Sequence, residues 1–411
     1  MSAVSLFTSR IAASPKRIAV RHHELGIWSP FTWAELGLQA ARLAEGLAML
    51  GVKRGDTVAL VMANHPSWIA ADVAIQSIGA VCLAIDPDSS ADTVCTEIET
   101  AGAVIALCGD QEQFDKVDEQ QQQGRVSSVR MRVVSDTRGM RLHGALRADA
   151  ATTMSFADLQ AKSTAASWTA DHAGTEPSPD TVAFISKGTA FTHGDVLAFG
   201  AAAHDRLGLG HADRLLAAAS FADPIERSFS LTGLLQHGFT LAIGEGGPLA
   251  RDERTAVQPT LFNAPDGLLD RVATELATKI ETSRGLNRLA LSRGWRPRVP
   301  GSVARPARVS VLQLVGLACL ASVVVWLWLT SAWTDQRRIF GAIGIALVFG
   351  LLTIAHGAAV TAPLRRQLGL KRVRAVVGRS SGIGAQMLGA LGVPLVDPTL
   401  FSPRPKENSG D

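Results

Sequence analysis

The sequence contains no tyrosine, although it has 411 residues and eight tryptophans. It has only four cysteines (Cys82, Cys95, Cys108 and Cys319), and none of them belongs to a CxxC pair. This argues against a disulfide framework or a zinc site and fits a reducing compartment. Charged residues make up only 19% of the chain and apolar residues 47%. This composition excludes a disordered protein, and it is more apolar than that of an ordinary cytosolic enzyme.

The net charge is only +3, but it is unevenly distributed. Residues 282–396 hold fifteen Lys or Arg and a single acid, Asp335, which gives this window a net charge of +14 and leaves −11 for the rest. Such asymmetry indicates an anionic partner for the basic window, either nucleic acid or a membrane surface. The hydrophobicity of the same window distinguishes between them.

Two long apolar runs lie inside the basic window. Residues 309–334 contain no charge, and residues 339–364 contain only His356 as an ionisable group. About 20 apolar residues span the hydrocarbon core of a bilayer, so both runs are long enough. Only residues 335–338 separate them, which predicts a tight antiparallel transmembrane hairpin. The alternative is a pair of buried helices in a large soluble core.

Basic residues flank this hairpin on both sides. Because positive residues stay on the cytoplasmic side, both ends are expected in the cytoplasm and the short loop outside. The N-terminus has no apolar stretch of signal-peptide length, so residues 1–284 are expected to remain cytoplasmic. The predicted protein is a two-helix, multi-pass protein of the inner (cytoplasmic) membrane that binds no nucleic acid. The residues expected to contact anionic headgroups are Arg305, Arg308, Arg365, Arg366, Lys371 and Arg372.

The region before the hairpin alternates between helix and strand patterns. Thr32 and Glu35 form a capping-box pattern ahead of an amphipathic run. The glutamine-rich residues 119–123 are expected to form a surface connection, and His22 and His23 are expected at the surface. Strand–helix–strand repetition predicts an α/β domain with parallel sheets covered by helices. The predicted helices are 36–50, 68–77 and 93–100, and the predicted strands are 57–62, 80–85, 103–107, 129–134, 182–185 and 215–219.

Several short segments carry a family resemblance through their order and spacing. The segments are GVKRGDTVAL (51–60), NHPSW (64–68), GAV (79–81), DTRGMR (136–141), MSFADL (154–159) and QPTLF (258–262). Together they resemble AMP-forming acyl-CoA synthetases, the adenylate-forming ligases, and most of all the long-chain fatty-acid branch. The resemblance covers residues 6–396. It implies a large N-terminal adenylation-type α/β domain that binds ATP with Mg²⁺ and a fatty acid, forms an acyl-adenylate, and transfers the acyl group to CoA.

The phosphate-binding loop of that family is altered. The family pattern is Tyr-Thr-Ser-Gly-Thr-Thr-Gly-x-Pro-Lys-Gly, followed by a Thr-His pair, whereas this chain reads FISKGTAFTH at 184–193. The tyrosine is replaced and about six residues of the loop are missing. The resemblance makes Ser186, Lys187, Gly188, Thr192 and His193 the remnants of an ATP-phosphate loop. The alternative is a tight strand-to-helix turn with a solvated lysine and with the histidine at the start of a helix.

The second nucleotide motif is altered as well. The family has Gly-Tyr-Gly-x-Thr-Glu, whose Glu holds the magnesium ion, but residues 392–401 offer neither Tyr nor Glu. The absence of tyrosine agrees with the loss of both motifs. No counterpart follows for the ribose-binding Asp, the hinge, or the small C-terminal domain with its catalytic Lys. The resemblance therefore implies a truncated, degenerate member with no catalytic residues, no metal ligands and no expected cofactor.

These observations predict four regions. They are an α/β acyl-CoA-synthetase-like domain (1–284), a basic juxtamembrane linker (285–308), the transmembrane hairpin (309–364), and a basic segment that returns to the α/β domain and ends in a polar tail (365–411). The predicted function is that of a pseudoenzyme that acts as a scaffold or acyl-binding subunit of a membrane complex, with lipid and a membrane protein as partners. The first alternative is an active long-chain acyl-CoA ligase of fatty acid metabolism, completed by a second polypeptide and using ATP and Mg²⁺. The second is a decayed gene product without a role.

Overall fold

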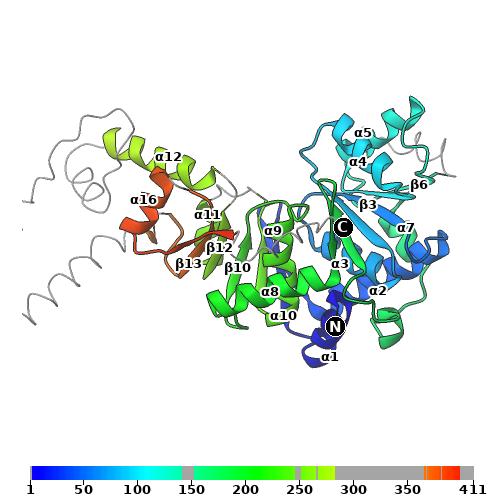
Figure 1. Cartoon of the computed structure of the whole chain (residues 1–411), viewed down its shortest axis with the longest axis horizontal. Helices are drawn as coiled ribbons and strands as arrows, with labels where there is room; N and C mark the ends of the chain where they lie inside the picture. The colour runs from blue at the N-terminus through cyan, green and yellow to red at the C-terminus, as the bar shows by residue number, and fades with distance from the viewer. Residues whose placement is uncertain are drawn as a thin grey trace, which may run out of the picture. The chain divides into compact units, whose positions relative to one another are not determined.

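The computed structural model forms two compact units (Figure 1). Unit 1 comprises Met1–Leu268, Gly369–Arg379 and Val393–Asp411, and unit 2 comprises Leu269–Leu368 and Ser380–Gly392. The residues that the structure describes are 2–140, 152–245, 251–264, 267–282, 365–366, 368–380 and 382–398.

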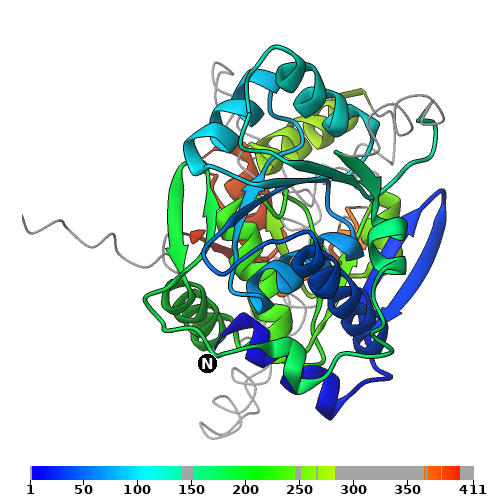
Figure 2. The same cartoon turned by 90° about the vertical axis from the view of Figure 1, so that its right-hand side faces the viewer.

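Unit 1 contains two seven-stranded sheets. The first sheet has the strand order β14-β13-β12-β10-β11-β1-β2, and all of its pairs are parallel except β1–β2. The β1–β2 ribbon is the dark blue pair at the right of Figure 2. The strands are β1 (Ile18–Glu24), β2 (Ile27–Thr32), β10 (Arg214–Ala217), β11 (Thr240–Ile243), β12 (Leu261–Ala264), β13 (Ala375–Gly378) and β14 (Leu395–Val396).

The second sheet repeats this arrangement. Its strand order is β7-β6-β5-β3-β4-β8-β9, again parallel except for one hairpin, β8–β9. The α/β class with mainly parallel sheets, predicted from the alternating pattern, is confirmed. The strands are β3 (Thr57–Val61), β4 (Val81–Ile85), β5 (Ile105–Cys108), β6 (Met131–Val134), β7 (Thr153–Ser155), β8 (Val182–Ser186) and β9 (Thr189–Thr192).

Helices connect the parallel strands, as crossover connections require. The Thr32–Glu35 capping box forms as predicted and starts α2, because Thr32 Oγ1 accepts from the Glu35 N–H while the Glu35 carboxylate accepts from the Thr32 N–H. The helices in the described part of unit 1 are α1 (Ala3–Ala13), α2 (Trp33–Met49), α3 (Pro66–Ser77), α4 (Ala91–Ala101), α5 (Gln111–Gln122), α7 (Phe156–Ala161), α8 (His193–Leu207), α9 (Pro224–Glu226), α10 (Gly233–His237) and α11 (Arg251–Val257). The same part of the chain also has a 3-10 turn, η1 (Ala170–Ala173), and a π-helical turn, η2 (Arg227–Thr232).

A single hydrophobic core includes residues of both sheets and of the helices α1, α2 and α3. The side chains of β3 point alternately to the two faces of the sheet. Val58 and Leu60 belong to this core, whereas Ala59 and Val61 belong to a second core under α4 and α5. The second sheet is therefore buried on both faces, which explains the continuous apolar runs of its strands. No charged residue lies inside β3 or β4.

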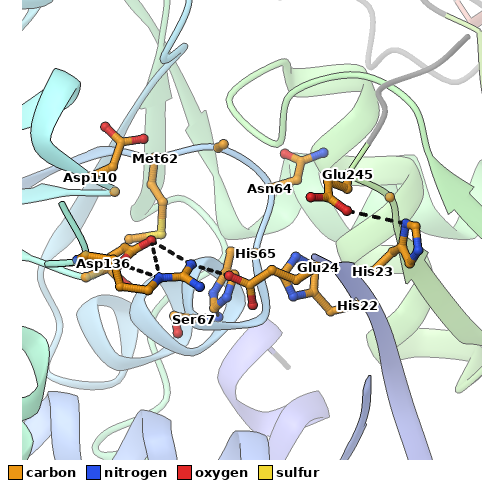
Figure 3. Close-up of a pocket in the computed structure, with 15 residues that line it drawn as sticks. His22, His23, Glu24, Met62, Asn64, His65, Ser67, Asp110, Asp136 and Glu245 are labelled. Carbon is orange, nitrogen blue, oxygen red and sulfur yellow. Dashed lines mark hydrogen bonds and ion pairs between the residues drawn. The ribbon is translucent and has the colours of Figure 1, made fainter. Parts of the chain in front are cut away.

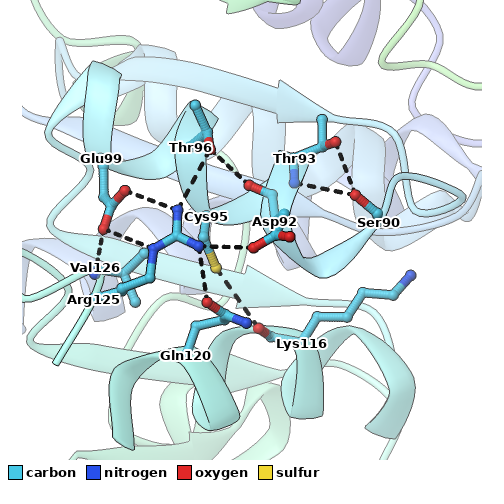
Figure 4. Close-up of polar contacts among 10 residues, drawn as sticks. All are labelled: Ser90, Asp92, Thr93, Cys95, Thr96, Glu99, Lys116, Gln120, Arg125 and Val126. Carbon is cyan, nitrogen blue, oxygen red and sulfur yellow. Dashed lines mark hydrogen bonds and ion pairs between the residues drawn. The ribbon is translucent and has the colours of Figure 1, made fainter. Parts of the chain in front are cut away.

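The helices α4 and α5 are joined by one arginine after α5 (Figure 4). The guanidinium of Arg125 donates to Asp92 Oδ1 (2.9 Å), Glu99 Oε2 (3.1 Å) and Gln120 Oε1 (3.0 Å). The next residue, Val126, has a φ of +44° and a fully buried side chain. A β-branched residue rarely adopts this conformation. Burial of its side chain and the bond from its N–H to Glu99 Oε1 (3.1 Å) hold it there.

Two expectations about local structure are wrong. Most of the glutamine-rich stretch 119–123 is not a connection, because α5 continues to Gln122; Phe114 and Val117 anchor one face of this polar helix in the core. The second concerns His22, which is buried rather than at the surface. The β1–β2 hairpin and β9 were not predicted at all.

The predicted transmembrane runs 309–334 and 339–364 lie outside the described residues. Within the described part of the chain, no helix has the length and apolar character needed to cross a bilayer. The hairpin therefore stays a prediction.

Unit 2 contains α12 (Leu268–Thr282), apart from its first residue, and α16 (Ile383–Ala390). Asp270 Oδ1 accepts from the Gly384 N–H (2.8 Å) and from the Ser380 hydroxyl (3.1 Å). One carboxylate of α12 thereby fixes the first turn of α16. Such a contact suits a helix N-terminus, whose free N–H groups attract negative charge.

Candidate functional site

The remnants of the predicted phosphate loop form a two-residue hairpin turn. Ser186 ends β8 and pairs with Thr189 of β9, so only Lys187 and Gly188 lie between the strands. Both have positive φ, +48° and +74°, as a type I′ turn requires. The connection is therefore a strand-to-strand turn and not the strand-to-helix turn of the alternative interpretation.

The polar groups of this turn are engaged by the fold. The Ser186 hydroxyl is buried and donates to the Ala222 carbonyl at 2.6 Å. The side chain of Lys187 is 62% exposed, and its Nζ lies 3.6 Å from Asp223 Oδ2. The pKa of Glu97 is raised, mainly by partial burial and to a smaller extent by Asp86. The positive charge of Lys187 acts in the opposite direction and lowers it. The lysine is thus an exposed side chain whose ammonium group lies beside one carboxylate.

The Thr-His pair begins a helix, as the alternative interpretation expects. Thr192 Oγ1 accepts from the Asp195 N–H (3.1 Å), and Asp195 Oδ2 accepts from the Thr192 N–H (3.0 Å). His193 is the first residue of α8 and is buried; this burial lowers the pKa of its imidazole. Both residues therefore have a local structural role, with no phosphate-facing geometry required to explain them.

The predicted membrane-surface residues are only partly within the described chain. Arg305 and Arg308 lie outside it, while Arg365 and Arg366 are helical and Lys371 and Arg372 are exposed. Their contact with lipid stays a prediction.

A buried glutamate lies near the loop that Ser186 contacts. Glu226 is fully buried, and its oxygens accept from Asn263 Nδ2 (2.6 Å), from the Ala219 N–H (3.3 Å) and from the Ser230 hydroxyl. Burial raises the pKa of Glu226 to about 7 against the opposing effect of these hydrogen bonds. The carboxyl group therefore titrates near neutral pH inside the protein.

A buried ion pair lies directly after this glutamate. The guanidinium of Arg227 contacts the Asp72 carboxylate, and both side chains are nearly fully buried. The same guanidinium lies 3.8 Å from the ring centroid of Phe184 in β8 and 5.1 Å from that of Trp68 in α3. Cation–π contacts of this kind are strongest in desolvated surroundings. The pair links β8 to α3 and η2.

A cavity of about 460 Å³ opens where strands of both sheets end. Its wall is formed by the end of β1, by the segments after β3, β5 and β6, and by the segment after β11. The carboxyl ends of parallel strands are the usual place for ligand sites in α/β proteins. The lining residues are His22, His23, Glu24, Met62, Ala63, Asn64, His65, Ser67, Gly109, Asp110, Ser135, Asp136, Arg138, Gly244 and Glu245.

Three of these side chains come together (Figure 3). His22 and Glu24 are two residues apart in β1 and therefore lie on the same face of the strand. His65 precedes α3 as its N-cap, and its Nδ1 accepts from the Ser67 N–H at 3.0 Å. The two rings meet edge to face with centroids 4.6 Å apart. One potential ligand atom from each of His22, Glu24 and His65 lies within 4.8 Å of the other two.

Electrostatics favour neutral rings beside paired carboxylates. Burial lowers the pKa of His22, and burial together with His22 lowers the pKa of His65 to about 4. Arg138 donates hydrogen bonds to Glu24 and to Asp136. The bond to Asp136 lowers the pKa of that carboxyl group. Dashed lines between the labelled Asp136 and Glu24 in Figure 3 mark these contacts.

His23 lies on the opposite face of β1 from His22. Its Nδ1 is 2.7 Å from Glu253 Oε1, and its ring stacks on Trp28. Without the β1–β2 hairpin, sequence reasoning had no basis for separating the two histidines. The alternation His22-x-Glu24 was the available signal, since it places both side chains on one face of a strand.

One family model matches most of this chain. The profile of the AMP-binding enzyme family matches residues 7–347. Long-chain-fatty-acid–CoA ligase FadD15 of Mycobacterium bovis is 38% identical over 80 residues, which are 20% of this chain and 13% of that protein. A feruloyl-CoA synthase of Amycolatopsis sp is 34% identical over 110 residues, 24% of this chain and 22% of that protein. The chain spans about half or less of the length of the curated relatives it matches.

Solved structures share the fold at low sequence identity. A benzoate CoA ligase from Burkholderia xenovorans LB400 aligns with a TM-score of 0.61 and 15% identity, over 98% of this chain and 62% of that one. A long-chain-fatty-acid-CoA ligase from Archaeoglobus fulgidus aligns with a TM-score of 0.56 and 14% identity, over 69% of this chain and 54% of that one. These likenesses concern the fold alone.

Proposed function

We propose that this chain does not form acyl-adenylates by itself. The premise is that the chain belongs to the AMP-binding enzyme family and has long-chain fatty-acid–CoA ligases among its homologues. In this proposal the α/β domain is a binding module of a membrane complex. It contacts a membrane protein, an acyl chain, or both.

The two-residue turn at Lys187 and Gly188 carries this proposal. A phosphate cradle needs several backbone N–H groups and hydroxyls that converge on one anion. Here two residues join β8 to β9, and the Ser186 hydroxyl already donates to a carbonyl. The lysine is exposed and its ammonium group lies beside the Asp223 carboxylate, which competes with a phosphate for it. These residues do not fit ATP with Mg²⁺, and no step of an adenylation is derived from them.

The intact scaffold supports a binding role over decay. The strands β3 and β4 are buried and free of charge, and the capping box of α2 is complete. Most random substitutions destabilise a protein by about 0.5–3 kcal/mol, so a chain without selection for folding accumulates damage in such strands. A maintained fold without a phosphate cradle favours a partner or a lipid as the reason for its retention.

Membrane anchoring is the second part of the proposal. It rests on the sequence of residues 309–334 and 339–364, each longer than a bilayer requires, and on the basic residues that flank them. In this proposal the hairpin anchors the protein in the cytoplasmic membrane with the α/β domain in the cytoplasm. Alkaline carbonate extraction tests it: the full chain should stay with the membrane pellet, and its release would contradict the anchor.

The decisive experiment is fatty-acid-dependent ATP–pyrophosphate exchange on the purified full chain in detergent. We expect no exchange above background. Exchange that is lost in Lys187→Ala but kept in Lys162→Ala, an exposed lysine at the end of α7, would overturn the proposal. Exchange that appears only after a second polypeptide is added would favour the alternative, a ligase completed in trans.

A further inference from the structure

We propose that His22, Glu24 and His65 form a binding site for a transition-metal cation, with Zn²⁺ the best match to the donor set. The site lies at the cavity on the carboxyl ends of the strands, apart from the β8–β9 turn. The proposal does not depend on the proposed function, because it concerns other residues and its test requires no nucleotide.

The geometry is the first argument. The spacing of β1 places His22 and Glu24 on one face of the strand, and the N-cap position of α3 brings His65 against them (Figure 3). Within the described ranges, this is the only group of three or more His, Cys, Asp or Glu side chains whose ligand atoms approach one another within 4.8 Å. A strand of the first sheet and the helix start that follows β3 of the second sheet thus converge on one point.

The donor chemistry is the second argument. Two imidazoles and one carboxylate are a set that binds Zn²⁺ with three protein ligands and leaves a fourth position open. Mg²⁺ and Ca²⁺ prefer oxygen ligands only, so this set disfavours them. His22 is buried, and its ring contacts the ring of His65 but makes no hydrogen bond to another described side chain or backbone group, which leaves its ring nitrogens available to a ligand.

The charge of the cavity is the third argument. Its wall adds the carboxylates of Asp110, Asp136 and Glu245 to that of Glu24, whereas Arg138 is the one lysine or arginine among the described residues that line it. Of the two Glu24 carboxylate oxygens, Arg138 contacts Oε1. The second oxygen, Oε2, is therefore available to a metal. The surroundings therefore attract a cation, and the cavity gives a water molecule access to the open position.

One existing contact competes with the metal. The Ser67 N–H donates to Nδ1 of His65, so a neutral ring carries its proton on Nε2. Binding through Nε2 requires the proton to move to Nδ1, and the bond from Ser67 is then lost. The site in its present state is therefore not fully preorganised, and metal binding is coupled to the start of α3.

This competition suggests a variant that separates the capping role of His65 from its role as a metal ligand. Asparagine is among the best N-cap residues but cannot replace the imidazole as a ligand at this distance. His65→Asn should therefore keep α3 capped while removing one metal ligand. A purely structural role for His65 predicts no change in metal binding in this variant.

The test uses the full chain without an affinity tag, purified in detergent and freed of metal by a chelator. Zn²⁺ is titrated calorimetrically, and Co²⁺ is titrated by its visible absorption, which reports coordination directly. We expect one ion per chain, with binding weakened at least about tenfold in His22→Gln, Glu24→Gln and His65→Asn. His23→Gln, on the opposite face of β1, should bind as the unmodified chain does.

Thermal unfolding of each metal-free variant shows whether it is folded. Folded variants that bind Zn²⁺ as tightly as the unmodified chain would overturn the proposal, and so would a chain that binds no ion. Equal losses in His23→Gln and His22→Gln would also overturn it, because the effect would not be specific to the triad.

Discussion

The two sheets of unit 1 each end in an antiparallel hairpin, and the hairpins are closed in the same way. Leu25 and Gly26 join β1 to β2 with φ values of +51° and +79°. Lys187 and Gly188 join β8 to β9 with φ values of +48° and +74°. Both turns pair a residue that resists this conformation with a glycine that accepts it.

The surroundings of the two hairpins differ. The first presents His22 and Glu24 to an open cavity, and Leu25 at its tip is 74% exposed. The second lies over a closed interior, where Arg227 packs against Phe184 of β8. The two turns share one backbone geometry, so the difference between the hairpins lies in the side chains at their base. Side chains at the base of each hairpin decide whether a ligand can approach.

The largest expected effect comes from the interior behind the second hairpin. Asp72→Ala leaves the Arg227 guanidinium buried without its carboxylate partner, which should lower the free energy of unfolding by about 3–5 kcal/mol. Chemical denaturation of the full chain measures this. The double variant Asp72→Ala with Arg227→Met should recover much of the loss, because it removes the unpaired charge.

A matched change at the first hairpin sharpens the contrast. Arg138→Ala breaks the ion pairs with Glu24 and Asp136, but the arginine side chain is exposed. Exposed pairs contribute little to stability, so we expect no large shift in the denaturation midpoint. Equal losses from Asp72→Ala and Arg138→Ala would contradict the difference in burial on which the comparison rests.

The next effect concerns pH. Glu226 supports the loop that Ser186 contacts, and burial raises its pKa to about 7 from an ordinary value of 4.5. Between these two values the folded protein retains a proton that the unfolded chain has released. Its contribution to the free energy of unfolding should therefore fall by about 3 kcal/mol as the pH rises through this window.

The variant Glu226→Gln isolates this contribution. An amide has the shape of the protonated acid and can still accept from Asn263 while donating to Ser230. Denaturation at pH 4.5, 6 and 8 should show a shallower loss of stability in the variant than in the unmodified chain. Identical slopes would mean that Glu226 does not titrate in this range.

A smaller effect tests whether the two turns are equivalent. Gly26→Ala and Gly188→Ala meet no atom within 4 Å of the added Cβ, so only the backbone conformation opposes them. Each should lower the free energy of unfolding by about 1–2 kcal/mol. If the hairpins are equivalent, the denaturation midpoints of the two variants shift by similar amounts.

The smallest effect has the opposite sign. Leu25→Asn places a residue that tolerates positive φ at the first turn and removes an exposed apolar side chain. We expect a gain of about 0.5–1 kcal/mol, by analogy with other substitutions that match the backbone conformation. Lys187→Asn should gain less because it also removes the contact with Asp223. A loss of stability in Leu25→Asn would indicate that the exposed leucine has contacts outside the described residues.

Much of the second sheet could be predicted from sequence, and most of the candidate site could not. The strands β3 and β4 are apolar throughout, since both faces are buried, and such runs are easily recognised. By contrast, β1 reads IAVRHHE, and its polar end gives no strand signal. The cavity depends on a pairing of β1 with β11, more than 200 residues later, which no local pattern encodes.

The turn shows the same limit at shorter range. The sequence predicts a loop at 186–188 that is shorter than the family pattern, and the structure has a two-residue turn there. The positive φ of Lys187 was not, because lysine is not a typical residue for a type I′ turn. Only the pairing of Ser186 with Thr189 defines the connection as a hairpin.

The pairing of β12 with β13 determines the order in which the protein can fold during synthesis. Leu261 lies opposite Ala375, and the whole stretch 283–364 is translated between them. The second sheet, whose strands all lie within residues 57–192, can form on the ribosome long before this point. The first sheet cannot be completed until β13 has been translated, and until then β12 is its unpaired edge. If residues 309–364 insert into a bilayer, they do so while that edge is still unpaired, so the membrane would be the surface beside which the last strands join.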